Sequence, residues 1–476
     1  MITPKKNLLE IQSDLTNGAY SMSDLVDSYL ETAKQHEALN IYVELYEESV
    51  KKEADRIDLK IKNGDALGSL FGCVISVKDV IAQKDQGLTA ASKILNGYTS
   101  PYNATAIERL LAEDAIVIGR TNCDEFGMGS GNENSIYGPT RNGLDKERVP
   151  GGSSGAAAVS IQMNTCLIAL GSDTGGSVRQ PASFCGVYGL KPSYGRISRY
   201  GLIAYASSFD QIGILGHHPD DIGLILEVSA GRDPLDATSS SNIVSKFSSD
   251  KIITNPTVAY FPSMVNHEKL DVEVKNNLLE HIEQLQDLGA SIVEKEFRYA
   301  DYLVPTYYVL TTAEASTNLS RYDGVRYGHR STSSDSLEEM YVNSRTEGFG
   351  KEVKRRIMLG TYVLSEGYFD AYFTKAQQVR RLITQEVNKV LDECDFIILP
   401  TSTSVPWKIG EMDEDPVAVY LSDMYTVLAN LTGLPAISLP SGNNKEGLPF
   451  GIQLMSRKYS EYELLALAKS LKPSTA

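Results

Sequence analysis

Two loops rich in glycine and serine constrain the fold of this chain more than any other feature. They cover residues 151–155 (GGSSG) and 171–177 (GSDTGGS), and an alanine-rich run and a short apolar segment separate them. Glycine lets the backbone approach a ligand closely, and serine supplies a hydroxyl that can attack, donate or accept. A helix and a buried strand between the loops would bring both to one end of a sheet, where α/β enzymes place their chemistry.

Short apolar strands alternate with helical patterns along the whole chain. We expect strands over 70–77, 115–119, 186–190, 258–260, 290–293, 396–399, 436–439 and 450–454, and helices over 7–16, 105–113, 219–229, 271–288, 366–393 and 462–471. This alternation predicts an α/β fold in which a central mixed, mostly parallel sheet is covered by helices on both faces. Without an internal repeat or a clear linker, we expect one domain over 1–476. It would comprise a helical N-terminal layer (1–65), a core that carries the loops (66–230) and a remainder that contributes a substrate pocket (231–476).

Charge and cysteine content narrow the function class. The formal net charge is −16, and an acidic surface repels phosphate backbones, so this chain is not expected to be the main nucleic-acid binder. The cysteines form no C-x-x-C pair, and Cys73, Cys166 and Cys185 lie in apolar runs typical of reduced intracellular proteins. We find no secretory signal and no run approaching ~18 apolar residues, which predicts a cytoplasmic protein without membrane spans.

Several common chemistries lack the residues they need. Neither loop carries the lysine of a phosphate-binding P-loop, and the short G-x-G-x-G run at 127–131 lacks the full dinucleotide fingerprint. None of the 6 histidines lies in a glycine-rich or strand-end motif, which argues against a Ser-His-Asp triad. No cluster of histidine, cysteine and carboxylate has metal-ligand spacing, so no metal is expected.

A lysine remains as the candidate base. Lys78 follows an apolar strand, and burial would lower its pKa because desolvation disfavours the ammonium. A serine and a lysine are a known nucleophile and base pair. The alternative is that Lys78 only pairs with a carboxylate such as Asp79, and the residues alone leave both interpretations open.

The motifs together resemble the amidase signature family. They are K-D at the end of a strand, G-G-S-S-G, G-S-D-T-G-G-S-V-R-Q-P and C-G-V-Y-G-L-K-P, and their spacing agrees with that family. The resemblance implies the amidase-signature fold and a Ser–cis-Ser–Lys triad. In that triad Ser177 is the nucleophile, Ser153 bridges after a cis peptide bond, and Lys78 is the base. The backbone N–H groups expected to form an oxyanion hole belong to Thr174, Gly175, Gly176 and Ser177.

Later motifs resemble the A subunits of bacterial glutamyl-tRNA(Gln)/aspartyl-tRNA(Asn) amidotransferases within that family. They are YYVLTTAEASTNLSRYDGVRYG at 307–328, RTEGFGKEVKRRI at 345–357 and YLSDMYT at 420–426. The resemblance implies that Arg356 meets the α-carboxylate of glutamine and Asp423 its α-ammonium, which suits a guanidinium fork and a carboxylate. The pocket would also be lined by Tyr307, Met128, Gly129 and Ser130.

The resemblance further implies a glutaminase that supplies ammonia for translation. Ammonia would pass to a B subunit, which uses ATP and Mg²⁺ to amidate Glu-tRNA(Gln) or Asp-tRNA(Asn), while a small C subunit wraps this chain in a heterotrimer. No cofactor is expected in this chain. The alternatives are a stand-alone amidase of another amide and a non-catalytic assembly protein. Val74, Val80 and Ala156 depart from the family pattern, which affects loop rigidity and partner contacts rather than the triad.

Overall fold

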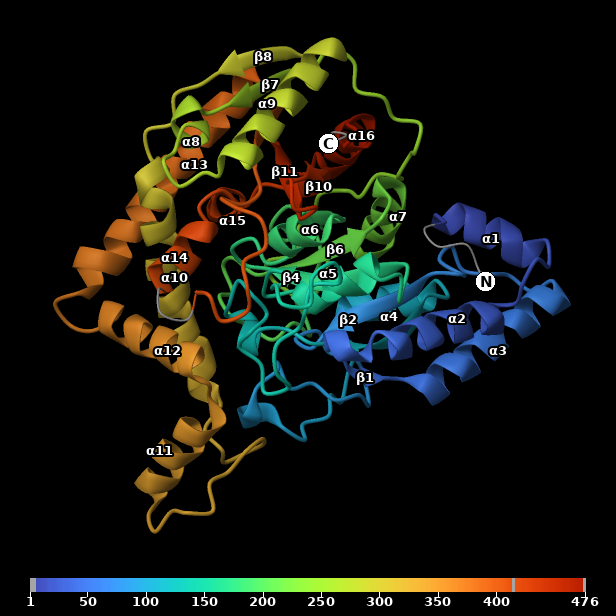
Figure 1. Cartoon of the computed structure of the whole chain (residues 1–476). Helices are drawn as coiled ribbons and strands as arrows, with labels where there is room; N and C mark the ends of the chain where they lie inside the picture. Colours follow the sequence, from blue (N-terminus) through green and yellow to red (C-terminus); the bar gives the residue numbers. More distant parts are fainter. Residues whose placement is uncertain (1–5, 413–415, 474–476) are drawn as a thin grey trace.

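One mixed sheet runs through the computed structural model, which describes residues 6–412 and 416–473 (Figure 1). Within those residues the sheet has 11 strands in the order β1-β3-β2-β4-β6-β5-β10-β11-β9-β7-β8. The strands are β1 Tyr42–Leu45, β2 Val74–Lys78, β3 Ile116–Thr121, β4 Ile168–Asp173, β5 Tyr188–Lys191, β6 Gln211–Gly216, β7 Thr257–Tyr260, β8 Ser291–Glu294, β9 Phe396–Pro400, β10 Ala436–Asn443 and β11 Pro449–Ser456.

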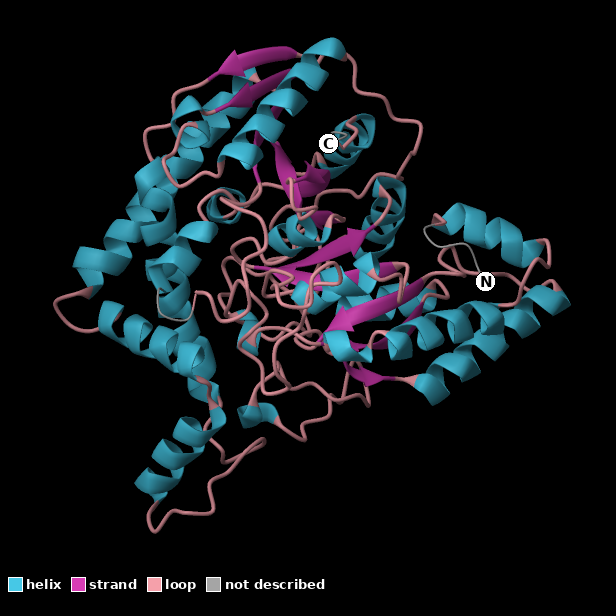
Figure 2. Ribbon diagram, in the orientation of Figure 1, coloured by secondary structure: helices cyan, strands magenta, loops and turns pink. Residues whose placement is uncertain are grey.

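Helices surround this sheet, as Figure 2 shows. Their bounds are α1 Leu8–Thr16, α2 Met22–Gln35, α3 Glu47–Asn63, α4 Thr105–Ala112, α5 Gly155–Gln162, α6 Arg179–Cys185, α7 Pro219–Ser229, α8 Pro262–Val265, α9 Val272–Asp287, α10 Leu303–Asn318, α11 Leu337–Gly348, α12 Lys351–Val363, α13 Lys375–Glu393, α14 Pro416–Ser422, α15 Val427–Thr432 and α16 Glu461–Ser470. None of the helices in the described residues could span a membrane.

The α/β fold and the mixed sheet are confirmed, but the expectation of a mostly parallel sheet is wrong. Parallel pairs join β3 to β2 to β4 at one end and β9 to β7 to β8 at the other. Among the described strands, the other pairs, which include every pair from β4 across to β9, are antiparallel. The central strands are buried on both faces. Such burial gives continuous apolar runs in either direction, so hydrophobicity could not reveal strand polarity.

Local signals explain where the N-terminal helices begin and end. Ser21 and Asp24 form a reciprocal capping box at the start of α2, and Gly64 ends α3 in the left-handed region with φ 72°. These helices lie together at one side of the molecule (Figure 1), as the predicted helical layer requires. The division of the chain into domains stays a prediction.

Among the segments that differ from the sequence-based expectation, two have a clear local reason. The helix expected over 366–393 is regular only from Lys375, because a π-helical turn, Asp370–Thr374, precedes α13 and Gly367 has a φ of 83°. β6 was not predicted, although it lies at the centre of the sheet between β4 and β5. Its sequence QIGILG contains two glycines, and a Cβ at Gly213 would approach Leu190 O to 2.8 Å. Glycine therefore allows close packing here but weakens the strand pattern.

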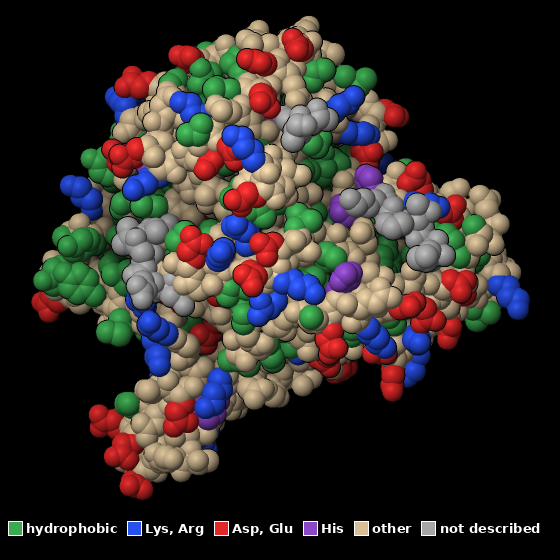
Figure 3. Space-filling view, in the orientation of Figure 1, with side chains coloured by type: hydrophobic (Ala, Val, Ile, Leu, Met, Phe, Trp, Pro, Cys, Tyr) green, Lys and Arg blue, Asp and Glu red, His purple; other side chains and the backbone are tan. Residues whose placement is uncertain are grey.

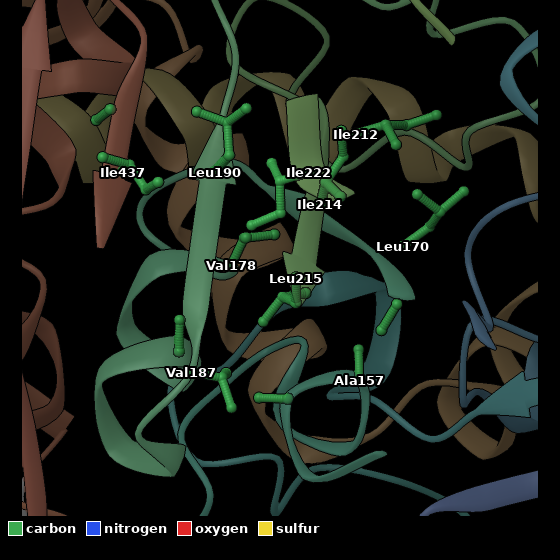
Figure 4. Close-up of a cluster of buried hydrophobic side chains, with 14 of the residues drawn as sticks. Ala157, Leu170, Val178, Val187, Leu190, Ile212, Ile214, Leu215, Ile222 and Ile437 are labelled. Atoms are coloured by element: carbon green, nitrogen blue, oxygen red, sulfur yellow. The ribbon is translucent and has the colours of Figure 1, made fainter. Parts of the chain in front are cut away.

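A dense apolar core fixes the two serine loops. Figure 4 shows buried side chains that meet from α5, β4, β5, β6, α7 and β10, including Ala157, Leu170, Leu190 and Ile214. The alanines of α5 are all buried, which lets this helix lie close to the sheet. Because this interior is close-packed, it restricts the movement of the two loops.

Acidic and basic side chains are interspersed over the face of the molecule that Figure 3 shows. The net charge of −16 is therefore not gathered into one acidic patch on this face.

Candidate active site

Lys78 lies fully buried at the carboxyl end of β2. Its Nζ donates to Ser153 Oγ at 2.7 Å, to Ser154 Oγ at 2.9 Å and to Ser172 Oγ at 2.9 Å. Burial lowers the pKa of Lys78 from 10.5 to about 8. Asp79 instead accepts from Thr89 N–H and from Arg120, so it is not the partner of Lys78.

The hydroxyl groups around Lys78 differ in what they can donate. Ser154 Oγ donates to Ser172 O at 3.0 Å, so it can only accept from the lysine. A neutral amine has two N–H donors and one lone pair. Ser153 or Ser172 can therefore donate to that lone pair, and Ser153 is the nearer of the two. The arrangement suits a proton transfer from Ser153 to Lys78.

Glycines shape the first serine loop. The Gly152–Ser153 peptide bond is cis, and the preceding Gly151 has a φ of 82°. A Cβ at Gly152 would approach Asp124 Oδ2 to 2.3 Å and Asn132 N to 2.7 Å, so no larger residue fits there. Gly152 N–H also donates to a glutamine side chain of α6 at 2.9 Å. The loop is thus fixed on both sides of Ser153.

Ser177 lies in the turn between β4 and α6 and is 9% exposed. Ser154 N–H donates to Ser177 O at 3.1 Å, which joins the two serine loops. Asp173 accepts from Val178 N–H at 3.2 Å, and Arg179 pairs with the same carboxylate. Although burial acts in the opposite direction, Arg179 lowers the pKa of Asp173 to about 2. A permanently ionised carboxylate therefore orders the turn that presents Ser177.

One member of the expected oxyanion hole is already occupied. Gly176 N–H donates to Asp173 Oδ1 at 3.0 Å. In this conformation that N–H cannot also bind an oxyanion, because Asp173 needs it to shape the turn. The N–H groups of Thr174, Gly175 and Ser177 remain as the candidates.

Asp423 and Arg356 form a second group of buried charges. Asp423 lies between α14 and α15 and accepts from Tyr308 Oη at 2.8 Å and Ser130 Oγ at 3.2 Å. Burial raises the pKa of Asp423 to about 6. Arg356, on α12, is 3% exposed and donates from Nε to Glu352 Oε1 at 2.8 Å. The carboxylate and the guanidinium expected from the sequence are thus both buried.

Aromatic rings connect these two charges. The guanidinium of Arg356 lies 5.4 Å from the Tyr308 ring and 5.6 Å from the Tyr205 and Tyr420 rings. Tyr308 stacks on Tyr420 with 4.0 Å between ring centroids, and its hydroxyl reaches Asp423. The structure therefore brings the two predicted head-group residues into one aromatic-walled site.

Tyr307 connects that site to the nucleophile turn. It lies beside Tyr308 on α10, and a Cβ at Gly175 would come within 2.4 Å of its hydroxyl. A cavity of about 210 Å³ opens next to Arg356 and includes Gly129, Ser130 and Tyr420 in its lining. The lining includes none of Ser153, Ser177 and Asp423, so the open space lies on the Arg356 side of the site. Met128 is fully buried and is not part of this lining.

Several contacts around these residues were missed from the sequence. Ser154 and Ser172 beside Lys78, and Glu352 and Tyr308 in the head-group site, were not singled out. The second serine of G-G-S-S-G and the tyrosine next to Tyr307 were visible signals. The i,i+4 spacing of Glu352 and Arg356 was another, since such pairs meet on a helix.

Comparison with known proteins gives a consistent result. A model of the amidase family matches residues 24–465. The A subunit of glutamyl-tRNA(Gln) amidotransferase from Chlorobaculum parvum is 48% identical over 97% of each chain, and that from Koribacter versatilis is 48% identical over 92% of each. The crystal structure of the protein of that name from Thermotoga maritima aligns with a TM-score of 0.78 at 37% identity, covering 94% of this chain and 91% of that one. Peptide amidase from Stenotrophomonas maltophilia shares the fold, with a TM-score of 0.83 at 24% identity over 98% of this chain and 96% of that one.

Proposed function

Since this chain belongs to the amidase family, we propose that it is the glutamine-hydrolysing subunit of a tRNA-dependent amidotransferase. The observation that carries the proposal is that a buried serine–lysine site occurs together with a buried arginine and a buried aspartate, Arg356 and Asp423, which both contact Tyr308. Hydrolysis of a simple amide needs only the serine–lysine site. An amino acid with a side-chain amide needs both.

The proposed reaction begins with attack by Ser177 Oγ on the side-chain amide carbon of glutamine. Its proton passes through Ser153 to the neutral Lys78, and backbone N–H groups of the turn stabilise the negative oxygen. The carbon–nitrogen bond then breaks, and Lys78 returns the proton through Ser153 to the nitrogen, which leaves as ammonia. Water attacks the glutamyl ester by the same route, releases glutamate and restores Ser177.

Arg356 and Asp423 are proposed to hold the head group of glutamine. The two donor nitrogens at the end of a guanidinium match a carboxylate, and Glu352 already holds Arg356 from the Nε side. Asp423 is ionised above about pH 6 and suits the α-ammonium. Tyr307, Met128, Gly129 and Ser130 are proposed to complete the walls of this pocket.

Ammonia would be used by partner subunits. We expect a B subunit that binds tRNA and uses ATP and Mg²⁺ to amidate Glu-tRNA(Gln) or Asp-tRNA(Asn), and a small C subunit, in a cytoplasmic heterotrimer. The net charge of −16 fits a chain that leaves tRNA to its partner. Affinity purification from the native cell should recover two further subunits with this chain. Recovery of this chain alone would favour a stand-alone amidase.

The head-group assignment predicts a substrate-dependent defect. Asp423→Asn and Arg356→Gln should each lower kcat/KM for glutamine by about 100-fold, because one charge of the substrate is then buried without a partner, at ~3 kcal/mol. Both variants should hydrolyse propionamide as the wild type does, since this amide has no charged group. Steady-state kinetics on both substrates measures the difference.

A matched control lies on the same helix. Lys354 donates to Thr346 O and is absent from the cavity lining, so Lys354→Gln should leave both substrates unaffected. Equal losses on glutamine and propionamide in the Asp423 and Arg356 variants would contradict the head-group assignment. Robust wild-type turnover of uncharged amides would favour the stand-alone amidase.

A further inference from the structure

Glu125 is a buried carboxylate outside the groups described so far. It begins the 3-10 turn Glu125–Gly127 and is 4% exposed. Ser92 Oγ donates to it, and Gly350 N–H donates to Oε1 at 3.1 Å and to Oε2 at 2.8 Å. Burial raises the pKa of Glu125 to about 7, so this position disfavours a charged side chain. A carboxylate at such a buried position indicates that its hydrogen bonds have a structural role.

The contact lies at the start of α12. Gly350 is the N-cap residue of that helix and has no side chain to cap the free N–H groups of the first turn. The Glu125 carboxylate accepts from the N–H of this N-cap residue, at the positive end of the helix dipole, which favours a carboxylate. A Cβ at residue 350 would lie 2.3 Å from Glu125 Oε2, so the close approach requires glycine.

The two segments that meet at this contact each carry a residue of the head-group site. The segment that begins with Glu125 runs to Ser130, which donates to Asp423. α12 carries Arg356 less than two turns after Gly350. Ser92 Oγ also donates to Gly348 O at 3.2 Å, which strengthens the attachment just before the helix. The Glu125–Gly350 contact therefore links the Ser130 segment to the start of the arginine helix, next to the packing of Phe126 on Phe349.

We propose that Glu125 is a positioning residue for substrate binding: it holds the start of α12 so that Arg356 stands at the correct distance from Asp423. This inference rests on the proposed function, because the distance matters only for a substrate with both charged groups. Displacement of a binding group by about 1 Å can cost 100-fold, even when the cause lies away from the reacting atoms.

Two variants approach the contact from opposite sides. Glu125→Ala removes the acceptor, and Gly350→Ala inserts a methyl group between the helix and the carboxylate. We expect each to raise KM for glutamine about tenfold or more while kcat changes by less than about twofold, the pattern of lost ground-state binding. Turnover of propionamide should not change. Glu125→Gln keeps a carbonyl oxygen for Gly350 N–H and should restore KM to within about threefold of the wild type.

Glu461 provides a matched control. It is also a buried carboxylate at the start of a helix, and it accepts from Ser193 N–H at 3.0 Å, but it lies on α16. Glu461→Ala should lower thermal stability without changing KM. Unchanged KM in folded Glu125→Ala or Gly350→Ala protein would overturn the inference, and so would equal losses on glutamine and propionamide. A wild type that does not hydrolyse glutamine would instead refute the proposed function.

Discussion

Ser177→Ala should abolish glutamine hydrolysis, lowering kcat by at least ~10⁴-fold. The substitution deletes the oxygen that we propose forms the ester, and no other group in the site can replace it. The turn itself should persist, because Asp173 holds it through backbone N–H groups and Arg179 rather than through the Ser177 hydroxyl. Ammonia release, measured with purified protein, gives the rate.

Binding and a neighbouring serine provide the controls for this variant. Glutamine should still raise the melting temperature of the Ser177→Ala protein, since Arg356 and Asp423 are intact. Ser183, on α6, has a buried hydroxyl without a hydrogen-bond partner in the described residues, so Ser183→Ala should keep full activity. Near-normal turnover by Ser177→Ala would show that another group is the nucleophile.

Lys78→Arg should also be inactive, with a loss of about 10³-fold or more. Arginine keeps its proton at any working pH, so it cannot accept the proton of Ser153. In the wild type, burial lowers the pKa of Lys78 to about 8, which means that the neutral base is the minor form at pH 7. Because the fraction of neutral Lys78 increases with pH, kcat/KM should rise ~10-fold per pH unit below about pH 8 and level off above it.

Lys191 tests whether that pH dependence belongs to Lys78. It is also fully buried, and burial lowers its pKa to about 7, but its Nζ donates only to Pro192 O among its described contacts. In Lys191→Met, kcat/KM should therefore still rise with pH and level off near pH 8. If Lys78→Arg retained activity, or if this rise vanished in Lys191→Met, the assignment of Lys78 as the base would be wrong.

The catalytic half of the site could be predicted because its residues lie in contiguous motifs. Ser153 and Ser177 sit in loops whose glycines mark tight backbone, and Lys78 follows an apolar strand, so each carries a local signal. Arg356 and Asp423 have no such signal, and only the resemblance to a family indicated them. Their proximity depends on how α10 packs against both α12 and α15, which periodicity does not encode.

Other features depend on contacts across long sequence separations. Strand polarity in the central sheet could not be read, because both faces of those strands are buried whatever their direction. No local pattern marks Glu125, and its partner Gly350 lies 225 residues away in the sequence. The occupied N–H of Gly176 likewise depends on the rotamer of Asp173, which sequence patterns do not determine.

The complete burial of Lys78 has a consequence for the form in which nitrogen is released. Lys78 is shielded from bulk solvent, so the proton that it takes from Ser177 stays beside the departing nitrogen during the step. The transfer of this one proton converts the amide nitrogen to NH₃, so the step itself yields ammonia rather than ammonium. The product therefore keeps its lone pair, and it leaves as a nucleophile ready for a second carbonyl.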